Sequence, residues 1–377
     1  MKHLLKTHIT LFNRAGLPSQ EHVYRSETNC NPHCEFWNRG NSVECHFPRS
    51  RSDYIIAETK AFALNAADNH QIDVLGGSGS IVGCDWSGVV LEVGENVTEF
   101  KPGDYVYGLC HGGNSVEPED GAFADIVTSK ESLTMHKPDF LSFQEAASLG
   151  VGLATIGQAL YWVLNLPLPS PEIPVNSGPT LLVYGGSSLT GTIAIQLAKL
   201  SGCRVFTTCS AHNKELVKSR GSDEWFDYSL PDCYERVNDI GASITYLLDC
   251  IGSEESSIFC SKVLAPTGGH YHSIKAPLPK AFKASRPETT AIATTAFAYS
   301  MTGERFEFPG MEFAADVAQG QFAKKWRDIA EDLVARRKIQ PHPVVTRRGG
   351  LHGVINGLNE IRSRAPRGHK IVYSRDP

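Results

Sequence analysis

The sequence predicts an α/β protein of two domains, the second built around a doubly wound parallel sheet. The chain has 377 residues, more than one compact core normally holds. A segment with five prolines, residues 165–179, separates two different patterns. Beyond it, apolar strand-like runs alternate with helical runs, which is the pattern of a parallel sheet covered by helices.

The region before the proline-rich segment is predicted to contain mainly strands. Residues 53–65 alternate like a strand that ends at Asn65, and residues 80–109 hold two strand-like runs separated by turn residues. Another short strand is expected within residues 119–129. Residues 142–164 then repeat apolar residues at helical spacing, and Ser142 with Glu145 makes a capping box that starts this helix.

The second pattern supplies the elements of the parallel sheet. Strands are expected at residues 180–184, 203–209, 224–228 and 244–250, with helices at 190–202 and 212–221 between them. The last sixty residues return to a helix, residues 324–338, followed by short strands and a further helix.

Composition excludes several classes of protein. Hydrophobic residues make up 41% and charged residues 20%, and the formal net charge is −5. We therefore expect neither nucleic acid nor an anionic membrane as a partner. The first twelve residues are interrupted by Lys6, Thr7 and His8, so they make a poor signal peptide, and no apolar run approaches the length of a membrane span. Ten scattered cysteines favour reduced thiols and a cytoplasmic location.

Residues 1–52 show little periodicity and are rich in Cys and His. Five of them could contact a zinc ion: Cys30, His33, Cys34, Cys45 and His46. Their spacing matches no standard structural zinc pattern. We therefore interpret them as incidental thiols and histidines.

The stretch "LLVYGGSSLTG", residues 181–191, indicates a phosphate-binding turn between a strand and a helix. A phosphate at a helix N-terminus needs unobstructed backbone N–H groups and the positive end of the helix dipole. Gly185, Gly186 and Gly191 are small enough for this, and hydroxyls are added by Ser187, Ser188 and Thr190, which flank Leu189. The turn lacks the spacing G-x-G-x-x-G, so a turn without cofactor is the alternative on this stretch alone.

The end of the following strand indicates which cofactor the turn binds. NAD-binding units carry an Asp or Glu there that bonds the ribose 2′-hydroxyl. Here the strand ends in Ser210, Ala211, His212, Asn213 and Lys214, which offer donors and a cation and no carboxylate to repel a 2′-phosphate. The sequence therefore predicts NADPH, with Tyr228 as a further wall of the pocket.

Several strings resemble the medium-chain dehydrogenase/reductase superfamily: "ALNAAD", "GCDWSGVVLEVGENVTEFKPGDYVYG", "GAFADIVTS", "EAASLGVGLAT" and the glycine turn. The resemblance implies a GroES-like β-barrel catalytic domain, residues 53–165, completed by the C-terminal segment 311–377. A Rossmann-type NADP-binding domain, residues 166–310, is inserted between them, and the active site lies in the cleft. Residues 1–52 form an atypical N-terminal segment, so either this edge of the barrel is built differently or the reading frame here is unusual.

The resemblance also indicates whether the chain holds a zinc ion. Alcohol dehydrogenases of this superfamily hold a zinc ion with a Cys and a G-H-E motif, where this chain has "NAADNH" and "GCDWSG". Cys84 stands at the place of that His, and the structural-zinc loop holds only Cys110. We expect no metal. Zinc-free relatives send hydride to the β-carbon of an activated double bond, which needs donors at the carbonyl oxygen and a proton for the α-carbon.

Further strings resemble the fungal trans-acting enoyl reductases of polyketide biosynthesis: "LNLPLPSP", "TCSAHNKELVKSRGSDEWFDY", "LLDCIGSEES", "GGHYHSI" and "PHPVVTRRGGL". Such enzymes reduce a carrier-bound enoyl thioester for a partner polyketide synthase, and they tend to be monomers. By position, the resemblance implies cofactor contacts by Asn65, Ala66, Ala67, Asp68, Asn69, His70, Ser187, Ser188, Leu189, Thr190, Ser210, Ala211, His212, Asn213, Tyr228, Ile274, Lys275, Ile371 and Val372. The implied substrate-lining residues are Leu149, Gly150, Val151, Gly152, Leu153, Ala154, Thr155 and Ile156.

Two of these residues are catalytic candidates. Thr155 is the polar group expected near the reacting carbonyl. His70 stands where the family usually has Lys, and we consider it as an enolate stabiliser or proton donor, the alternatives being a ribose contact or an inert loop histidine.

A basic C-terminal segment could serve the partner synthase. Residues 321–377 contain 13 Lys and Arg against 5 Asp and Glu, and the basic residues include Arg336, Arg337, Lys338, Arg347, Arg348, Arg362, Arg364 and Arg367. Such a patch would steer an acidic carrier domain, although a solvated helix end is the plain alternative. Two other functions stay open: a free-standing zinc-free quinone or alkenal reductase, and a catalytically impaired cofactor-binding or scaffold protein.

Overall fold

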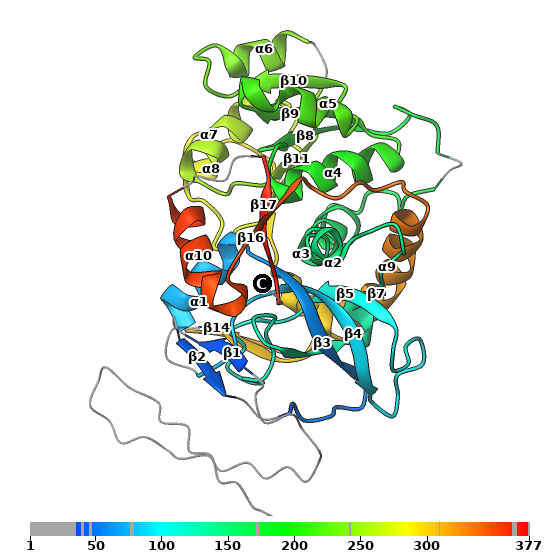
Figure 1. Ribbon diagram of the computed structural model, residues 1–377. Coiled ribbons are helices and arrows are strands. Elements are labelled where there is room, and N and C mark those ends of the chain that lie inside the picture. Colours follow the sequence, from blue (N-terminus) through cyan, green and yellow to red (C-terminus); the bar gives the residue numbers. More distant parts are fainter. Residues whose placement is uncertain are drawn as a thin grey trace, which may run out of the picture.

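Two sheets lie at opposite ends of the molecule, with helices α2 (Phe143–Ala147) and α3 (Gly150–Gly157) between them (Figure 1). The structure is a computed structural model that describes residues 35–38, 41–44, 47–75, 79–170, 173–240, 243–308, 310–363 and 368–375. Most of the predicted atypical segment, residues 1–52, lies outside this range, including Cys30, His33, Cys34, Cys45 and His46.

The first sheet has seven strands and is mainly antiparallel. Its strand order is β16 (Val344–Arg347), β17 (Lys370–Ser374), β3 (Tyr54–Ala63), β4 (Asp85–Val93), β5 (Tyr105–Leu109) and β7 (Thr134–His136), with β6 (Ile126–Lys130) paired to β3. Strand β3 pairs with β4 along nearly its whole length, and on its other side it pairs with β6 in its first half and with β17 at its end, where Ala63 faces Val372. Strand β17 thus joins a sheet whose strand β3 begins about 320 residues earlier in the chain.

The second sheet has six parallel strands. Its order is β10 (Glu224–Asp227), β9 (Arg204–Cys209), β8 (Thr180–Tyr184), β11 (Tyr246–Asp249), β12 (His270–Ser273) and β13 (Ile292–Thr295). The strand order changes direction between β8 and β11, which is where doubly wound sheets bind their ligands. The predicted doubly wound sheet is confirmed.

Helices and short hairpins complete the fold. The α-helices not yet given are α1 (Ala66–Leu75), α4 (Leu189–Leu200), α5 (Lys214–Ser219), α6 (Cys233–Asp239), α7 (Glu254–Val263), α8 (Ala281–Ala284), α9 (Val317–Ala335) and α10 (Val354–Arg362). Short helical turns are η1 (Glu131–Leu133), η3 (Ala211–Asn213), η4 (Ala298–Thr302) and η5 (Gly350–Gly353), and the hairpins are β1 (Glu35–Asn38) with β2 (Asn41–Glu44) and β14 (Phe306–Phe308) with β15 (Met311–Phe313).

The single helix predicted over residues 142–164 is divided into three parts. Ser142 and Glu145 form the predicted capping box at α2, and the chain then continues through α3 into a π-helix, η2 (Gln158–Val163). Trp326 of α9 explains where the helix widens. Its Nε1 donates to the carbonyl oxygen of Leu153 at 2.9 Å, and a Cβ on Gly157 would lie 2.0 Å from that nitrogen. The indole therefore occupies the side of the helix where the hydrogen-bond ladder changes from α to π.

This same segment corrects one expectation from the sequence. Residues 143–163 form a 21-residue helical stretch that is long and apolar enough to cross a membrane, whereas we expected no such run. However, 78% of its most apolar window is buried inside the protein, between the two sheets. It is the central core helix, which the length criterion alone does not distinguish from a membrane span.

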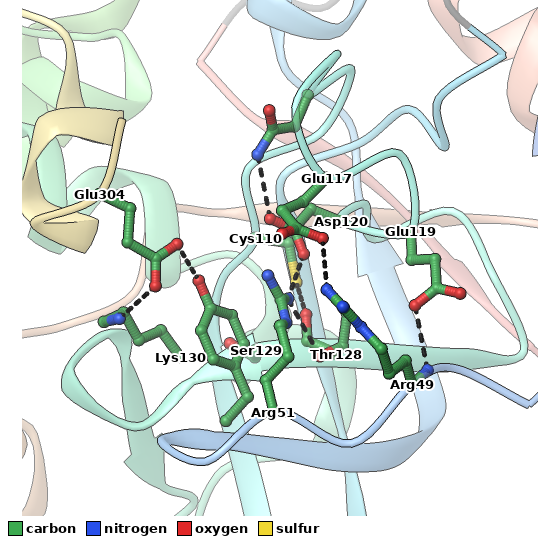
Figure 2. Close-up of polar contacts among 12 residues, drawn as sticks. Arg49, Arg51, Cys110, Glu117, Glu119, Asp120, Thr128, Ser129, Lys130 and Glu304 are labelled. Carbon is green, nitrogen blue, oxygen red and sulfur yellow. Dashed lines mark hydrogen bonds and ion pairs between the residues drawn. The ribbon is translucent and has the colours of Figure 1, made fainter. Parts of the chain in front are cut away.

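Ion pairs connect the loop between β5 and β6 to the residues just before β3 (Figure 2). Arg51 forms a partly buried ion pair with Asp120, and its guanidinium lies 3.4 Å above the centre of the Tyr54 ring. Arg49 pairs with Glu117 at 2.9 Å. These ion pairs hold residues 49–54 at the edge of the first sheet. The sequence alone did not indicate how this edge of the barrel is formed.

Candidate active site

The glycine turn opens helix α4 at the switch point of the second sheet. Ser188 is its N-cap, and its Oγ accepts a hydrogen bond from Gly191 N at 3.0 Å. Gly185 has a φ of +81°, which favours glycine. A Cβ on Gly186 would lie 1.9 Å from Thr207 Oγ1, and one on Gly191 would lie 2.3 Å from the carbonyl oxygen of Gly185. The three glycines thus bring the backbone close together, as a phosphate cradle requires.

The turn is fixed to the neighbouring strand β9 by two hydrogen bonds. Gly185 N donates to Thr208 Oγ1 at 3.0 Å, and Gly186 N donates to the Thr208 carbonyl oxygen at 2.9 Å. As a result, the turn lies beside the end of β9, where the sequence predicts the 2′-phosphate pocket.

The residues predicted to line that pocket are mostly polar. Ser210 Oγ and Tyr228 OH lie 2.8 Å apart, and Tyr228 is 47% exposed. Ala211 and His212 are exposed, while Asn213 and Lys214 are half-buried. The Lys214 ammonium lies 5.3 Å from the centre of the Trp225 ring.

The C-terminal segment comes close to one of these residues, Asn213. A Cβ on Gly368 would lie 2.6 Å from Asn213 Oδ1, so the chain approaches Asn213 closely just before β17. The predicted basic residues Arg364 and Arg367 lie outside the described residues. A carboxylate, Asp227, ends the neighbouring strand β10, and its Oδ1 accepts a hydrogen bond from Ser229 Oγ at 2.6 Å.

The predicted cofactor segment, residues 65–70, lies against the predicted pair Ile371 and Val372. Leu64 N donates to the Ile371 carbonyl oxygen at 2.9 Å, and helix α1 begins immediately after Asn65. Within the segment Asn65, Asp68 and Asn69 are buried, whereas Ala66, Ala67 and His70 are exposed. Ile274 and Lys275 follow β12 at the carboxyl edge of the parallel sheet, where Ile274 N donates to the Asp249 carbonyl oxygen.

Helix α3 presents only part of the predicted substrate segment. Leu149, Leu153 and Ile156 are fully buried in the core, and Gly150, Gly152 and Ala154 are buried too. Val151 and Thr155 are half-buried and lie four residues apart on one face of the helix. They are the only residues of the predicted substrate segment, 149–156, that are not buried.

An aromatic cluster near α1 was missed from the sequence. It consists of His111, Phe297, Tyr299, Phe306, Phe308 and Phe313. The His111 and Tyr299 rings stack at 3.7 Å, and the His70 ring lies 6.5 Å from that of Phe308. The dense aromatic spacing of residues 297–313 was the available signal, but only the tertiary structure places these rings beside α1.

Cys84 lies in a hydrogen-bonded group rather than among metal ligands. Gln71 Nε2 donates to Cys84 Sγ at 3.0 Å and to Tyr299 OH at 2.6 Å, and burial raises the pKa of the Cys84 thiol. Cys110 donates to the Thr128 carbonyl oxygen at 3.3 Å (Figure 2). Within the described ranges, no group of three or more His, Cys, Asp or Glu side chains could hold a metal ion.

One buried histidine in this region makes stability depend on pH. His342 Nδ1 lies 3.0 Å from Thr192 Oγ1 of α4, and burial, with Lys370, Arg220 and His369 nearby, lowers the pKa of His342 to about 3. In the unfolded chain the His342 imidazole takes up a proton near pH 6.5, whereas in the folded protein it stays neutral down to about pH 3. The contribution of the neutral, buried His342 to the free energy of unfolding is therefore fully present above pH 6.5 and is lost as the pH falls.

We therefore expect His342→Gln to flatten the fall in stability on acidification. Between pH 6 and 4 the free energy of unfolding of the wild type should drop more steeply than that of the variant, by up to about 1.4 kcal/mol per pH unit. Urea unfolding at several pH values measures this difference. Parallel curves for the two proteins would contradict it.

Comparisons with known proteins agree with this geometry. The alcohol dehydrogenase GroES-like domain matches residues 51–139, and the zinc-binding dehydrogenase domain matches residues 190–292. The enoyl reductase CurK has a similar fold, with a TM-score of 0.68 and 18% identity over 90% of this chain and 98% of its own. A quinone oxidoreductase from Coxiella burnetii gives 0.66 and 21% identity over 90% and 98%. The GroES-like and Rossmann-like domains place this chain in the medium-chain dehydrogenase/reductase superfamily, whose dehydrogenases use nicotinamide cofactors.

Sequence relatives define the family within that class. Trans-enoyl reductase resD of Aspergillus sclerotiorum is 36% identical over 342 residues, covering 86% of this chain and 94% of the relative. Trans-enoyl reductase TOXD of Cochliobolus carbonum is 42% identical over 261 residues, covering 69% and 85%. The chain belongs to the trans-enoyl reductase family, and it is an oxidoreductase acting on CH–CH groups.

Proposed function

We propose that this protein is an NADPH-dependent, trans-acting enoyl reductase that reduces the α,β-double bond of a carrier-bound polyketide enoyl thioester. The observation that carries the proposal is the convergence of four distant segments. The glycine turn is hydrogen-bonded to the end of β9, directly before residues 210–214. Gly368 lies against Asn213, and Leu64, directly before residues 65–70, is hydrogen-bonded to Ile371. Sequence similarity to trans-enoyl reductases supports the reaction class.

In this proposal each segment has a separate role. Ser188, Thr190 and the first N–H groups of α4 hold the pyrophosphate, and Ser210, Asn213 and Lys214 hold the 2′-phosphate. When bound, the reduced nicotinamide supplies a hydride for the β-carbon of the substrate.

The chain's own residues then handle the resulting charge. The electron pair of the double bond moves toward the thioester carbonyl, whose oxygen becomes an enolate oxygen that needs a hydrogen-bond donor. Thr155 on the accessible face of α3 donates to that oxygen. His70, exposed at the end of the cofactor segment, stabilises the enolate or delivers the proton to the α-carbon.

The basic C-terminal segment is the proposed approach for an acidic carrier domain. Its charge is partly neutralised, because Arg336, Arg347 and Arg362 pair at 2.7 Å with Asp332, Glu360 and Asp73. Arg337, Lys338 and Arg348 are exposed. The remaining positive field would favour encounter with the carrier more than tight binding.

The test is NADPH oxidation with enoyl thioesters, both carrier-bound and free, compared with simple quinones. We expect thioester reduction, at least a tenfold preference for NADPH over NADH, and a rate with the carrier-bound substrate that falls more steeply with salt. Faster turnover of quinones would favour the free-standing reductase, and tight NADPH binding without turnover of any acceptor would favour the impaired protein. In the same assay, unchanged turnover in both H70A and H70K would remove the role of His70.

A further inference from the structure

One buried carboxylate, Asp85, joins the segments of the proposed site. It begins β4, and its side chain is fully buried. Its Oδ1 accepts a hydrogen bond from Val151 N at 2.6 Å. Its Oδ2 accepts from Asn65 Nδ2 at 3.0 Å and forms an ion pair with Lys370 Nζ. Lys370 Nζ also donates to Asn65 Oδ1 at 2.6 Å, which closes a ring of three side chains.

Each partner of Asp85 belongs to a different segment. Asn65 opens the segment that precedes and begins α1, and its backbone N–H donates to Asp68 Oδ2 at 2.6 Å. Lys370 begins β17 and directly precedes Ile371. Val151 lies in the first turn of α3, four residues before Thr155. The predicted cofactor segments and the predicted substrate segment are therefore connected through one side chain.

The contact with α3 is also electrostatically favourable and tightly packed. A carboxylate near the N-terminus of a helix interacts well with the helix dipole and with N–H groups that have no partner inside the helix. A Cβ on Gly150 would lie 2.9 Å from Asp85 Oδ1 and 2.2 Å from the Gly108 carbonyl oxygen. The first turn of α3 is thus held against β4 and β5 with no space between them.

Stability alone does not account for such a pair. Burying two charges costs desolvation energy that their attraction largely offsets, and apolar residues of similar volume often serve the core equally well. What an ion pair with directed hydrogen bonds adds is a fixed geometry. Here that geometry relates residues 65–70 to the accessible face of α3.

We propose that Asp85 and Lys370 are positioning residues, which set the distance between the bound nicotinamide and the substrate without touching either. The proposal rests on the proposed function, because it concerns the hydride-transfer geometry of that same site. Reactions that depend on close approach are sensitive to small displacements, and an error of about 1 Å can cost about 100-fold in rate.

The main test is the double variant D85N/K370M, which removes both charges together and so leaves no uncompensated buried charge. We expect kcat for a free enoyl thioester to fall about 100-fold, with the KM and the Kd for NADPH changing less than threefold. The primary isotope effect with NADPH deuterated at C4 should rise as hydride transfer becomes slower. Because the pair acts as a unit, D85N alone should lower kcat nearly as much.

The matched control is K199M/D223N, the same replacements in a Lys–Asp pair of the second sheet's domain. Lys199 Nζ lies 2.8 Å from Asp223 Oδ2 at the far end of α4 from the glycine turn. Its kcat should stay at the wild-type value. The conservative variant K370R keeps the positive charge, so it should retain most of the kcat that is lost when Lys370 is replaced by Met.

Several outcomes would overturn the proposal. One is a D85N/K370M enzyme with unchanged kcat, and another is a loss confined to the NADPH affinity or to the free energy of unfolding. A wild type that reduces quinones and not enoyl thioesters would overturn the proposed function instead. The same variants assayed with the quinone would then still decide the positioning role.

Discussion

Replacing Gly191 with alanine is expected to weaken NADPH binding by about two orders of magnitude, or about 2.7 kcal/mol. The new Cβ would lie 2.3 Å from the Gly185 carbonyl oxygen and 2.6 Å from Gly186 Cα. Both contacts are with backbone atoms, so the turn itself must move apart. The N–H groups of the turn would then no longer converge on a phosphate. Fluorescence titration with NADPH measures the effect.

The control for this experiment is Gly178→Ala, next to the same sheet. Its Cβ would lie 3.3 Å from the backbone of Gly202, a contact that a small shift relieves, and Gly178 precedes β8 whereas the turn follows that strand. This variant should bind NADPH like the wild type. If Gly191→Ala also keeps wild-type affinity while remaining folded, the turn does not hold the phosphates, and the cofactor site lies elsewhere.

The second large effect is expected for Gly157→Ala, which should lower the free energy of unfolding by about 2–3 kcal/mol. The added Cβ would lie 2.0 Å from Trp326 Nε1. The indole would have to retreat, and its hydrogen bond to the Leu153 carbonyl oxygen would be lost. Both partners are buried, so no water replaces that bond. Urea unfolding monitored by tryptophan fluorescence and circular dichroism measures the loss.

A double-mutant cycle identifies the cause. Trp326→Leu removes the atom with which the new methyl group collides, although it leaves a cavity of its own. In that background Gly157→Ala should cost less than about 1 kcal/mol, since alanine is intrinsically a better helix former than glycine. Additive effects of the two changes would show that the indole is not what requires glycine at position 157.

The local elements could be predicted because they depend on neighbours in sequence. The capping box of Ser142 and Glu145 formed as expected, and the strand-to-helix alternation after residue 180 gave the six-stranded parallel sheet. Both follow from side-chain periodicity and capping chemistry within a few residues. The chain leaves that sheet at Thr295, and the η4 turn and the β14–β15 hairpin then pack near His70 and His111, which no local pattern indicated.

The basic C-terminal segment shows the limit of charge counting. The sequence contains an excess of eight positive charges there, which suggested an open docking surface. In the fold, Arg362 instead binds helix α1, with its Nε donating to Asn69 Oδ1 at 2.7 Å and its Nη2 donating to Asp73 Oδ1 at 2.7 Å. Lys370 is buried against Asp85. A count of charges cannot tell which cations already have partners, because those partners lie about 290 residues away in the chain.

By itself the sequence determined the doubly wound sheet, the glycine turn and the family, because each is encoded in continuous stretches of residues. The tertiary structure alone decided how Asn65, Val151 and Lys370 meet on Asp85, and which residues of α3 are partly exposed. Those arrangements depend on directed contacts between segments that are distant in the chain. Only folding brings such donors and acceptors within the 3 Å at which a hydrogen bond acts.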